Sequence, residues 1–228
     1  MNLTYWEQDW VHTRMKAYDI KYQEIYDELF DHITTAIEAR RDAGDNSSLE
    51  TMYLEIIDAQ FGGYFGIGKV AASYENGYKS KVKKMIWGNY RQYINYHSLL
   101  FTAALIAISF VLPHNKLTTV ILFSLILISA ACCSAYAYIT LRRIKPSKGK
   151  TSLVYNHIIT QANLPLMFVN CALWLPQIPY LLFSDHEPKN LLLSGPPAIL
   201  ALMLAMILIY NLSCMRLCKQ ELKGFVNI

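Results

Sequence analysis

The stretch LTTVILFSLILISAACCSAYAYITL, residues 117–141, decides the fold class of this chain. Its 25 residues contain no Asp, Glu, Lys or Arg, and a helix needs about 20 mostly apolar residues to cross the hydrocarbon core of a bilayer. Three further apolar segments lie at residues 96–112, 164–183 and 197–217. We therefore expect an all-α polytopic membrane protein whose four transmembrane helices form a bundle over residues 96–217.

Basic residues are distributed unequally between the segments that join these spans. One side of the predicted bundle has only Lys116 and Lys189. The other side has thirteen basic residues: Lys79, Lys81, Lys83, Lys84, Arg91, Arg142, Arg143, Lys145, Lys148, Lys150, Arg216, Lys219 and Lys223. Short loops rich in Lys and Arg stay in the cytoplasm. We expect both termini to be cytoplasmic, in a multi-pass protein of the cell (inner) membrane.

The first span is the shortest of the four. Its apolar run, residues 99–112, has a length that also occurs in interfacial or buried helices. Extending the helix backward through residues 94–98 supplies the missing length. If this segment failed to cross, the N-terminal domain and the loop after the second span would lie on opposite faces, although both are basic next to the membrane. We therefore retain four spans.

Charge divides the chain into four segments. Residues 1–78 form a small acidic domain with fourteen acidic and six basic residues. They are followed by a basic juxtamembrane collar at 79–95, the bundle at 96–217 and a cytoplasmic tail at 218–228. An acidic domain is repelled by anionic headgroups and lacks the basic face that nucleic acids require. The N-terminus is polar, so no cleavable signal is expected and the first span serves as the insertion signal.

Apolar periodicity predicts helices throughout the acidic domain. Thr4 and Glu7 have the spacing of a capping box and start a helix that ends near Met15. A second helix is expected over about 20–43, with Gly44 as its C-terminal cap. Ser47 and Glu50 have capping-box spacing for a third helix. A fourth is expected from about Gly66, and with no proline before residue 113 it could continue through the collar into the first span.

Part of this domain resembles the HAAS-type, or permease-prefix, helical domain found ahead of membrane spans. The resemblance covers residues 20–75 and rests on EIYDELFDHITTAIEARRDAG (24–44), the turn FGG (61–63) and GIGKVAASYENG (66–77). Glu28 and His32 match the acidic–apolar–His pattern of that family. Gly63 stands where an acidic residue is usual, and the Gly66/Gly68 pair is also a departure. The resemblance implies a bacterial inner-membrane protein with a sensing, regulatory or permease-associated role, and no catalytic residues.

The second predicted helix carries a candidate partner-binding face: Glu24, Asp27, Glu28, Asp31 and His32. Glu28 and His32, one helical turn apart, could ligate a metal, but a bundle metal site needs such motifs from at least two helices. The third helix offers only isolated carboxylates. A solvated or partner-binding face is therefore favoured over a metal site.

A glycine pattern and a cysteine pair each match part of a functional motif. Residues 63–69 match the first seven positions of a P-loop, but Val70 replaces the required Ser or Thr. About 90 helical residues also cannot supply the strand that precedes such a loop, so these glycines are interpreted as a helix break. Cys214 and Cys218 share a helix face and could hold half a metal site or an acyl chain, but no His or second Cys pair accompanies them. Packing of small apolar residues in the bundle is therefore favoured.

Within the bundle, the candidate site residues are uncharged. Asn170, Gln177 and Asn211 could form a polar bundle site, and prolines at 165, 176 and 179 bend the third span. An isolated Asn more often joins two helices by a hydrogen bond. The spans contain no acidic residue and no basic residue before their cytoplasmic ends, unlike the spans of proton-coupled transporters. We expect no catalytic residue, no metal and no cofactor.

These observations favour a non-enzymatic integral membrane protein. Its expected role is a regulatory, sensing or interaction module in which the helical domain is coupled to the four-span bundle. The alternative is a permease or transporter component that acts as an oligomer. Beyond the lipid bilayer, the expected partners are a protein bound through residues 1–78 or further copies of the chain through the bundle, and no nucleic acid.

Overall fold

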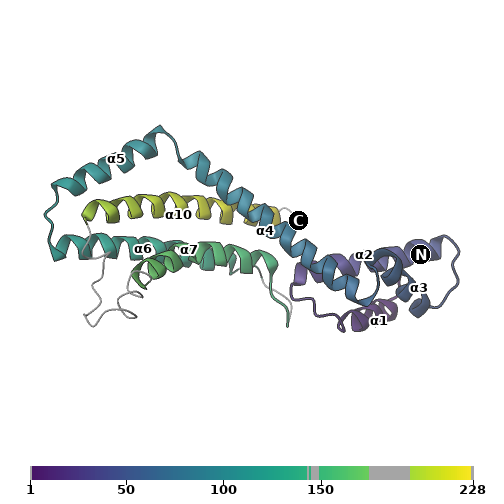
Figure 1. Cartoon of the computed structure of the whole chain (residues 1–228). Coiled ribbons are helices and arrows are strands. Elements are labelled where there is room, and N and C mark those ends of the chain that lie inside the picture. The colour runs from purple at the N-terminus through teal and green to yellow at the C-terminus, as the bar shows by residue number, and fades with distance from the viewer. Residues whose placement is uncertain (1, 143, 145–148, 175–195, 227–228) are drawn as a thin grey trace, which may run out of the picture. The chain divides into compact units, whose positions relative to one another are not determined.

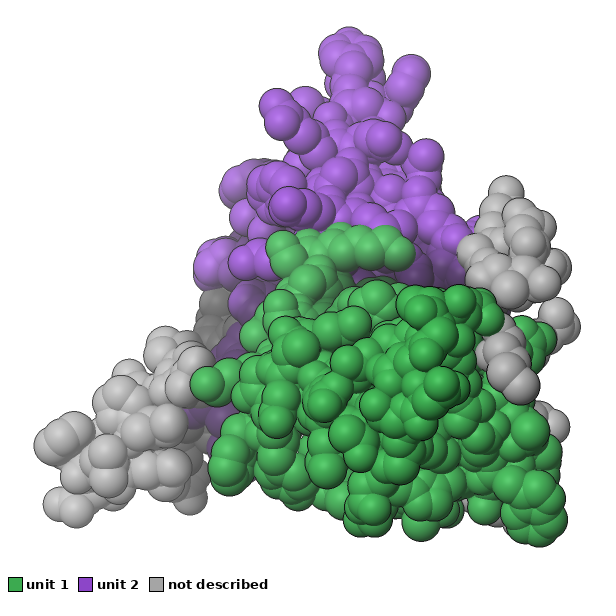
Figure 2. Space-filling model, turned by 90° about the vertical axis from the view of Figure 1, so that its right-hand side faces the viewer, with its two compact units in different colours: residues 1–81, 144–156 green, residues 82–143, 157–228 purple. Residues whose placement is uncertain are grey.

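The computed structural model describes residues 2–142, 144, 149–174 and 196–226 of the 228-residue chain. Over these residues the chain is all-helical, with eight α-helices, one π-helical turn and a single isolated β-bridge (Figure 1). It divides into two compact units (Figure 2). The N-terminal unit comprises residues 1–81 and 144–156, and the bundle unit comprises residues 82–143 and 157–228.

The N-terminal unit is built around one apolar core. Its helices are α1 (Tyr5–Met15), α2 (Gln23–Asp42), α3 (Leu49–Ile56), the π turn η1 (Ile57–Phe61) and the first part of α4 (Tyr64–Tyr93). The apolar positions predicted for the second helix include Leu29, Ile33 and Ile37, which are at most 1% exposed. They pack with side chains of α1, α3 and α4, among them Met15, Met52 and Ile67. The amphipathic pattern therefore predicted this core correctly.

Local capping signals fixed several helix ends. The Thr4–Glu7 capping box is present at the start of α1, and Gly44 follows α2 with a left-handed φ of 88°. The predicted start of the third helix was wrong by one residue, because Ser48 rather than Ser47 accepts the hydrogen bond from the backbone N–H of Thr51. Two left-handed glycines, at residues 62 and 63, separate η1 from α4.

Glu7 also joins α1 to α2, and this contact makes the N-terminal unit sensitive to acid. Its carboxylate accepts hydrogen bonds from the Arg41 guanidinium and from the backbone N–H (2.8 Å) and hydroxyl (2.7 Å) of Thr4. These bonds, the one from Arg41 contributing most, lower the pKa of Glu7 to about 2. In an unfolded chain the pKa of a Glu side chain is about 4.3. The stabilisation is therefore complete above about pH 4.3 and is lost as the pH falls through about 2.

We expect Glu7→Gln to remove this part of the pH dependence. As the pH is lowered from about 5 to about 2, a range that includes the folded and unfolded pKa values of Glu7, the thermal midpoint should fall less steeply in the variant than in the wild type. The midpoint is measured on the full chain in detergent. Glu50→Gln is the matched control, since it removes an exposed 2.8 Å ion pair with Arg14 and should leave the slope unchanged. An unaltered slope in Glu7→Gln would contradict the prediction.

The bundle unit contains α5 (Tyr96–Val111), α6 (Lys116–Leu141), α10 (Pro197–Val226) and most of α7 (Leu153–Trp174). Among the described residues, α6 and residues 197–222 of α10 are long and apolar enough to cross a membrane. A third span is present if the bent pair α4 and α5 is counted as one. The predicted third span, 164–183, lies partly outside the described residues. Two or three such helices are compatible with a helical membrane protein.

The helix of the first predicted span, residues 96–112, has its expected bounds within one residue, but it is separated from the helix before it. Helix α4 is continuous through the collar, including Asn76 and Gly77, but it ends at Tyr93, and α5 begins after a bend of 73°. Asn95 causes the break, because its side chain accepts a hydrogen bond from the Ser98 N–H (3.0 Å) and caps α5. Residues 96–98 of the backward extension are therefore helical as predicted, whereas residues 94 and 95 lie in the break, so the helix of the collar does not continue into the first span. The 16 residues of α5 span only about 24 Å at about 1.5 Å per residue.

Helix α10 is the centre of the bundle unit. It packs against α6 and α5, and α6 and α10 run in the same direction (Figure 1). Leu200 and Leu204 of α10 form an apolar cluster with Ile126 of α6 and Val169 of α7. The predicted tail is also largely helical, because α10 continues to Val226.

Candidate functional site

The segment after α6 is a structural part of the N-terminal unit, which the sequence did not indicate. We call residues 149–156 the docking segment. Its Thr151 forms a parallel β-bridge with Tyr22, just before α2. The Thr151 N–H donates to the carbonyl of Lys21 (3.2 Å), and the Thr151 carbonyl accepts from the N–H of Gln23 (3.0 Å). This backbone pairing attaches the docking segment to the entry of α2.

Lys150 fastens one end of the docking segment. Its ammonium donates to the carbonyl of Ile20 (2.7 Å) and lies 4.3 Å from the centroid of the Tyr26 ring, an arrangement that favours a cation over the aromatic face. Burial lowers the pKa of Lys150, while Asp19 and Asp27 act in the opposite direction. Lys150, one of the thirteen basic residues that predict the orientation of the spans, thus has a structural role in the N-terminal unit.

Glu24 holds the other end, where α7 begins. One carboxylate oxygen accepts a hydrogen bond from the backbone N–H of Leu153 (2.8 Å), and the other accepts from the Ser152 hydroxyl (2.5 Å). Ser152 in turn caps α7 by accepting from the N–H of Tyr155 (3.2 Å). A carboxylate at a helix N-terminus satisfies free N–H groups and interacts favourably with the helix dipole. Glu24 is therefore a helix-capping residue contributed from 129 positions away.

The hydroxyl of Tyr22 links the two helices that leave this unit. Tyr22 is only 2% exposed. Its hydroxyl donates to a carboxylate oxygen of Glu75 on α4 (3.4 Å) and accepts from the side-chain amide of Asn156 on α7 (3.0 Å). The start of α2 is therefore connected by hydrogen bonds to both α4 and α7.

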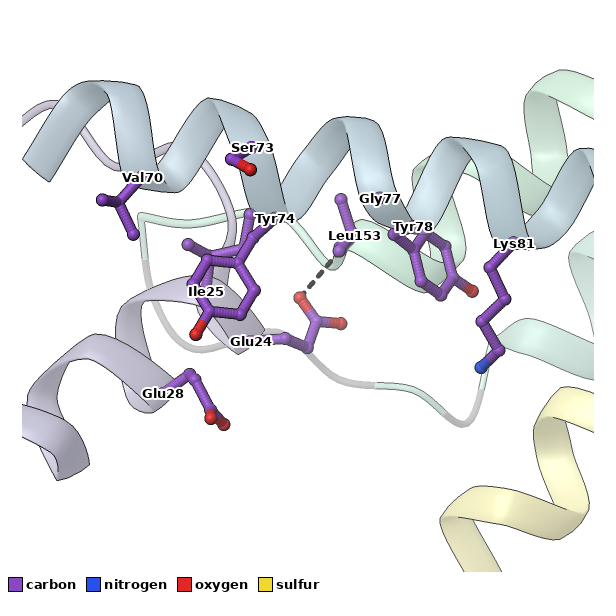
Figure 3. Close-up of a pocket in the computed structure, with 10 residues that line it drawn as sticks. All are labelled: Glu24, Ile25, Glu28, Val70, Ser73, Tyr74, Gly77, Tyr78, Lys81 and Leu153. Carbon is purple, nitrogen blue, oxygen red and sulfur yellow. Dashed lines mark hydrogen bonds between the residues drawn. The ribbon is translucent and has the colours of Figure 1, made fainter.

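A groove of about 600 Å³ lies between α2 and α4, beside the docking segment (Figure 3). Glu24, Ile25 and Glu28 line it from α2, and Leu153 closes it from the docking segment. On α4 the lining residues are Val70, Ser73, Tyr74, Gly77, Tyr78 and Lys81. Figure 3 shows the Tyr74 side chain beside Ile25 of α2, with Tyr78 and Lys81 further along α4. The volume falls within the range of about 300–1,000 Å³ that is usual for ligand sites.

The groove has an acidic wall and an aromatic wall. Glu28 is exposed and makes no hydrogen bond or ion pair with any described residue, so its carboxylate is available to a ligand. On the opposite wall, the Lys81 ammonium lies 5.6 Å from the centroid of the Tyr78 ring. Ile25 and Leu153 add apolar side chains to the lining. This combination suits an extended peptide or a side chain that carries both apolar and cationic groups.

The five residues of the predicted partner-binding face do not share one environment in the structure. Glu24 caps α7 and Glu28 lines the groove, whereas Asp27, Asp31 and His32 are exposed and do not line it. Asp27 accepts a hydrogen bond from the side chain of Gln23 (2.6 Å), and the His32 ring meets Phe61 edge to face at 6.4 Å. Across the described ranges, no three His, Cys, Asp or Glu side chains are placed to hold a metal ion.

Gly63 of the P-loop-like pattern lies at the predicted helix break, but the other two glycines of the pattern do not. Gly66 and Gly68 lie inside α4, which starts at Tyr64, and the break falls at residues 62–63. Lys69 is exposed on the same helix. In the part of the chain that the structure describes, no strand precedes this segment, so the geometry of a phosphate-binding loop is missing there.

The candidate polar residues of the bundle are not brought together. Asn170 is exposed on α7, and Gln177 lies outside the described residues. Asn211 is 4% exposed, and its amide donates to the carbonyl (2.9 Å) and hydroxyl (2.8 Å) of Ser129 on α6. Asn211 therefore joins α10 to α6, which is the ordinary role of a single Asn in a bundle.

Two further polar links hold the bundle unit together and were missed from sequence. The Ser134 hydroxyl of α6 donates to the Ala162 carbonyl of α7 (3.1 Å). The Tyr210 hydroxyl of α10 donates to the carbonyl of Gln161 (3.1 Å). Cys133, Cys214 and Cys218 are fully buried in the same part of the unit. A serine or tyrosine inside a predicted span is the signal that could have indicated such interhelical bonds.

Comparison of the chain with protein-family models, curated proteins and solved structures found no match. The resemblance to the HAAS-type domain therefore stays a prediction from residues 20–75.

Proposed function

We propose that this chain is a non-enzymatic regulatory or sensing module of a bacterial inner membrane. In this proposal, the N-terminal unit binds a cytoplasmic protein partner in the groove between α2 and α4. Binding there is transmitted to the bundle unit through α4 and α7. The resemblance of residues 20–75 to HAAS-type domains is consistent with such a role.

One observation carries this proposal: α4 and α7 each belong to both compact units. Helix α4 passes from the N-terminal unit to the bundle unit after Lys81, and α7 passes after Asn156. The Tyr22 hydroxyl bonds to both helices inside the N-terminal unit. A partner that displaces α2 must therefore act on the first turn of α7 and on α4 together. Helices transmit such displacements well because they are rigid elements.

The same proposal includes four spans with both termini in the cytoplasm. Thirteen basic residues on one side of the predicted bundle support that orientation. The parallel course of α6 and α10 (Figure 1) is what a second and a fourth span require, since both would end on the cytoplasmic side.

The test is affinity purification of the full-length chain from its native membranes in mild detergent. We expect a stoichiometric soluble protein to co-purify, and Glu28→Lys to reduce its recovery at least about tenfold, because an uncompensated charge in an interface costs several kcal/mol. Asp31→Lys is the matched control, with the same charge change on the same helix but outside the groove. It should retain the partner.

Other outcomes distinguish the alternatives. Equal loss in both variants would assign binding to the acidic face of α2 as a whole rather than to the groove. A membrane transport complex that is unaffected by Glu28→Lys would contradict the regulatory proposal. That result would favour a permease or transporter component assembled through the bundle.

A further inference from the structure

A second, apolar cleft of about 500 Å³ lies entirely within the bundle unit, between α4, α7 and α10. The lining residues that matter here are Trp87 and Tyr90 of α4, Pro165 and Phe168 of α7, and Met206 and Tyr210 of α10. Trp87 and Tyr90 are stacked, with ring centroids 5.8 Å apart. The stacked rings of α4 form one wall of the cleft, and the methionine, proline and aromatic side chains of α7 and α10 form the other walls.

The chemistry of the lining favours a hydrocarbon chain. The hydroxyl of Tyr210 is already engaged with Gln161, and Pro165 has no backbone N–H to offer. Methionine adapts its shape to irregular apolar ligands. Tryptophan and tyrosine are favoured where an apolar environment meets lipid headgroups. The cleft thus offers an apolar volume together with the residues that usually mark the membrane interface.

Unpaired cations flank the cleft on α4. Lys83 lies one helical turn before Trp87, on the face that also carries Tyr90, and Arg91 lies one turn after Trp87. Both are exposed, and neither pairs with a carboxylate anywhere in the described part of the chain. Lys84 is exposed in the same way. An anionic group placed between Lys83 and Arg91 would compensate these charges.

We propose that the bundle unit binds one anionic phospholipid at this cleft. An acyl chain occupies the apolar volume against Trp87 and Phe168, and the phosphate contacts Lys83 and Arg91. This inference goes beyond the regulatory role proposed above and does not depend on it. In this proposal the basic collar binds one specific lipid, in addition to being attracted to anionic membranes in general.

The test uses native mass spectrometry of the delipidated full-length chain with phosphatidylglycerol or phosphatidylcholine added in detergent. We expect one phosphatidylglycerol to bind each chain more tightly than phosphatidylcholine. The double variant Lys83→Gln/Arg91→Gln should weaken phosphatidylglycerol binding about 30-fold, the effect of two cations beside an anionic headgroup. Lys16→Gln/Lys69→Gln removes two exposed cations of the N-terminal unit and should change nothing.

A second variant tests the acyl-chain part of the proposal. Met206→Trp fills the cleft and leaves the cations in place, so it should abolish one-to-one binding while the thermal midpoint of the chain is retained. Undiminished binding to Met206→Trp would overturn the cleft as the site. Equal binding of the two lipids, or no effect of the Lys83/Arg91 variant, would overturn the assignment of the headgroup.

Discussion

Replacing Gly66 by alanine should destabilise the N-terminal unit by at least about 3 kcal/mol, the upper part of the range for overpacked sites. A Cβ atom at this position would lie 1.6 Å from the carbonyl oxygen of Phe61 and 2.6 Å from its carbonyl carbon. These are backbone atoms at the end of η1, so no side-chain rotation can relieve the collision. The turn at residues 62 and 63 holds η1 against the start of α4 through two left-handed glycines.

The matched control for this prediction is two residues away. A Cβ atom on Gly68 meets nothing within 4 Å, so Gly68→Ala should stabilise α4 by up to about 1 kcal/mol through helix propensity. Thermal unfolding of the full chain in detergent, followed by circular dichroism, compares the two variants. Hydrogen exchange of the α3 and α4 amides should locate the damage in Gly66→Ala. Equal stability of both variants would show that η1 and α4 do not approach this closely.

Glu24→Ala should release the docking segment from α2. The substitution removes the acceptors for the Leu153 N–H and the Ser152 hydroxyl, and Ser152 is 3% exposed. Leaving a buried donor without a partner costs about 1–3 kcal/mol. If the segment opens locally, exchange of the Leu153 amide should accelerate about 5- to 150-fold, the same free energy expressed as an opening equilibrium.

The control for Glu24→Ala is Glu28→Ala, one helical turn further along α2. It removes a carboxylate from the same groove but breaks no hydrogen bond among the described residues. Its Leu153 amide should exchange at the wild-type rate. Acceleration in Glu28→Ala but not in Glu24→Ala would contradict the assignment of Glu24 as the cap of α7.

The sequence predicted those parts of the fold that depend on neighbours in the chain. The Thr4–Glu7 box, the Gly44 cap and the buried stripe of α2 all follow from spacings of three or four residues, because these distances are fixed by the helix itself. The bounds of α6 were predicted to within one residue, since its polar flanks are abrupt. The Asn95–Ser98 cap belongs to the same class of signal and could have been used to predict the bend before α5.

The candidate site could not be predicted in the same way, because it is formed by contacts distant in sequence. The hydrogen bonds of Glu24 and Lys150 join residues about 130 positions apart. Neither helical periodicity nor charge sorting carries information about such pairs. By charge sorting, Lys150 belongs to the basic residues that orient the spans, and by periodicity Glu24 belongs to one acidic face of α2 with Asp27, Glu28, Asp31 and His32. The start of α7 at Leu153 was also not predicted, because the third apolar segment begins only at residue 164.

The place of the docking segment in the N-terminal unit has a consequence for synthesis of the chain. Leu153 contributes to the core of the N-terminal unit, yet α5 and α6 precede it in the sequence. During synthesis, residues 1–81 therefore cannot complete their core until α5, α6 and then residue 153 have left the ribosome. The final stage in the maturation of the N-terminal unit is thereby timed by the translation of α5 and α6.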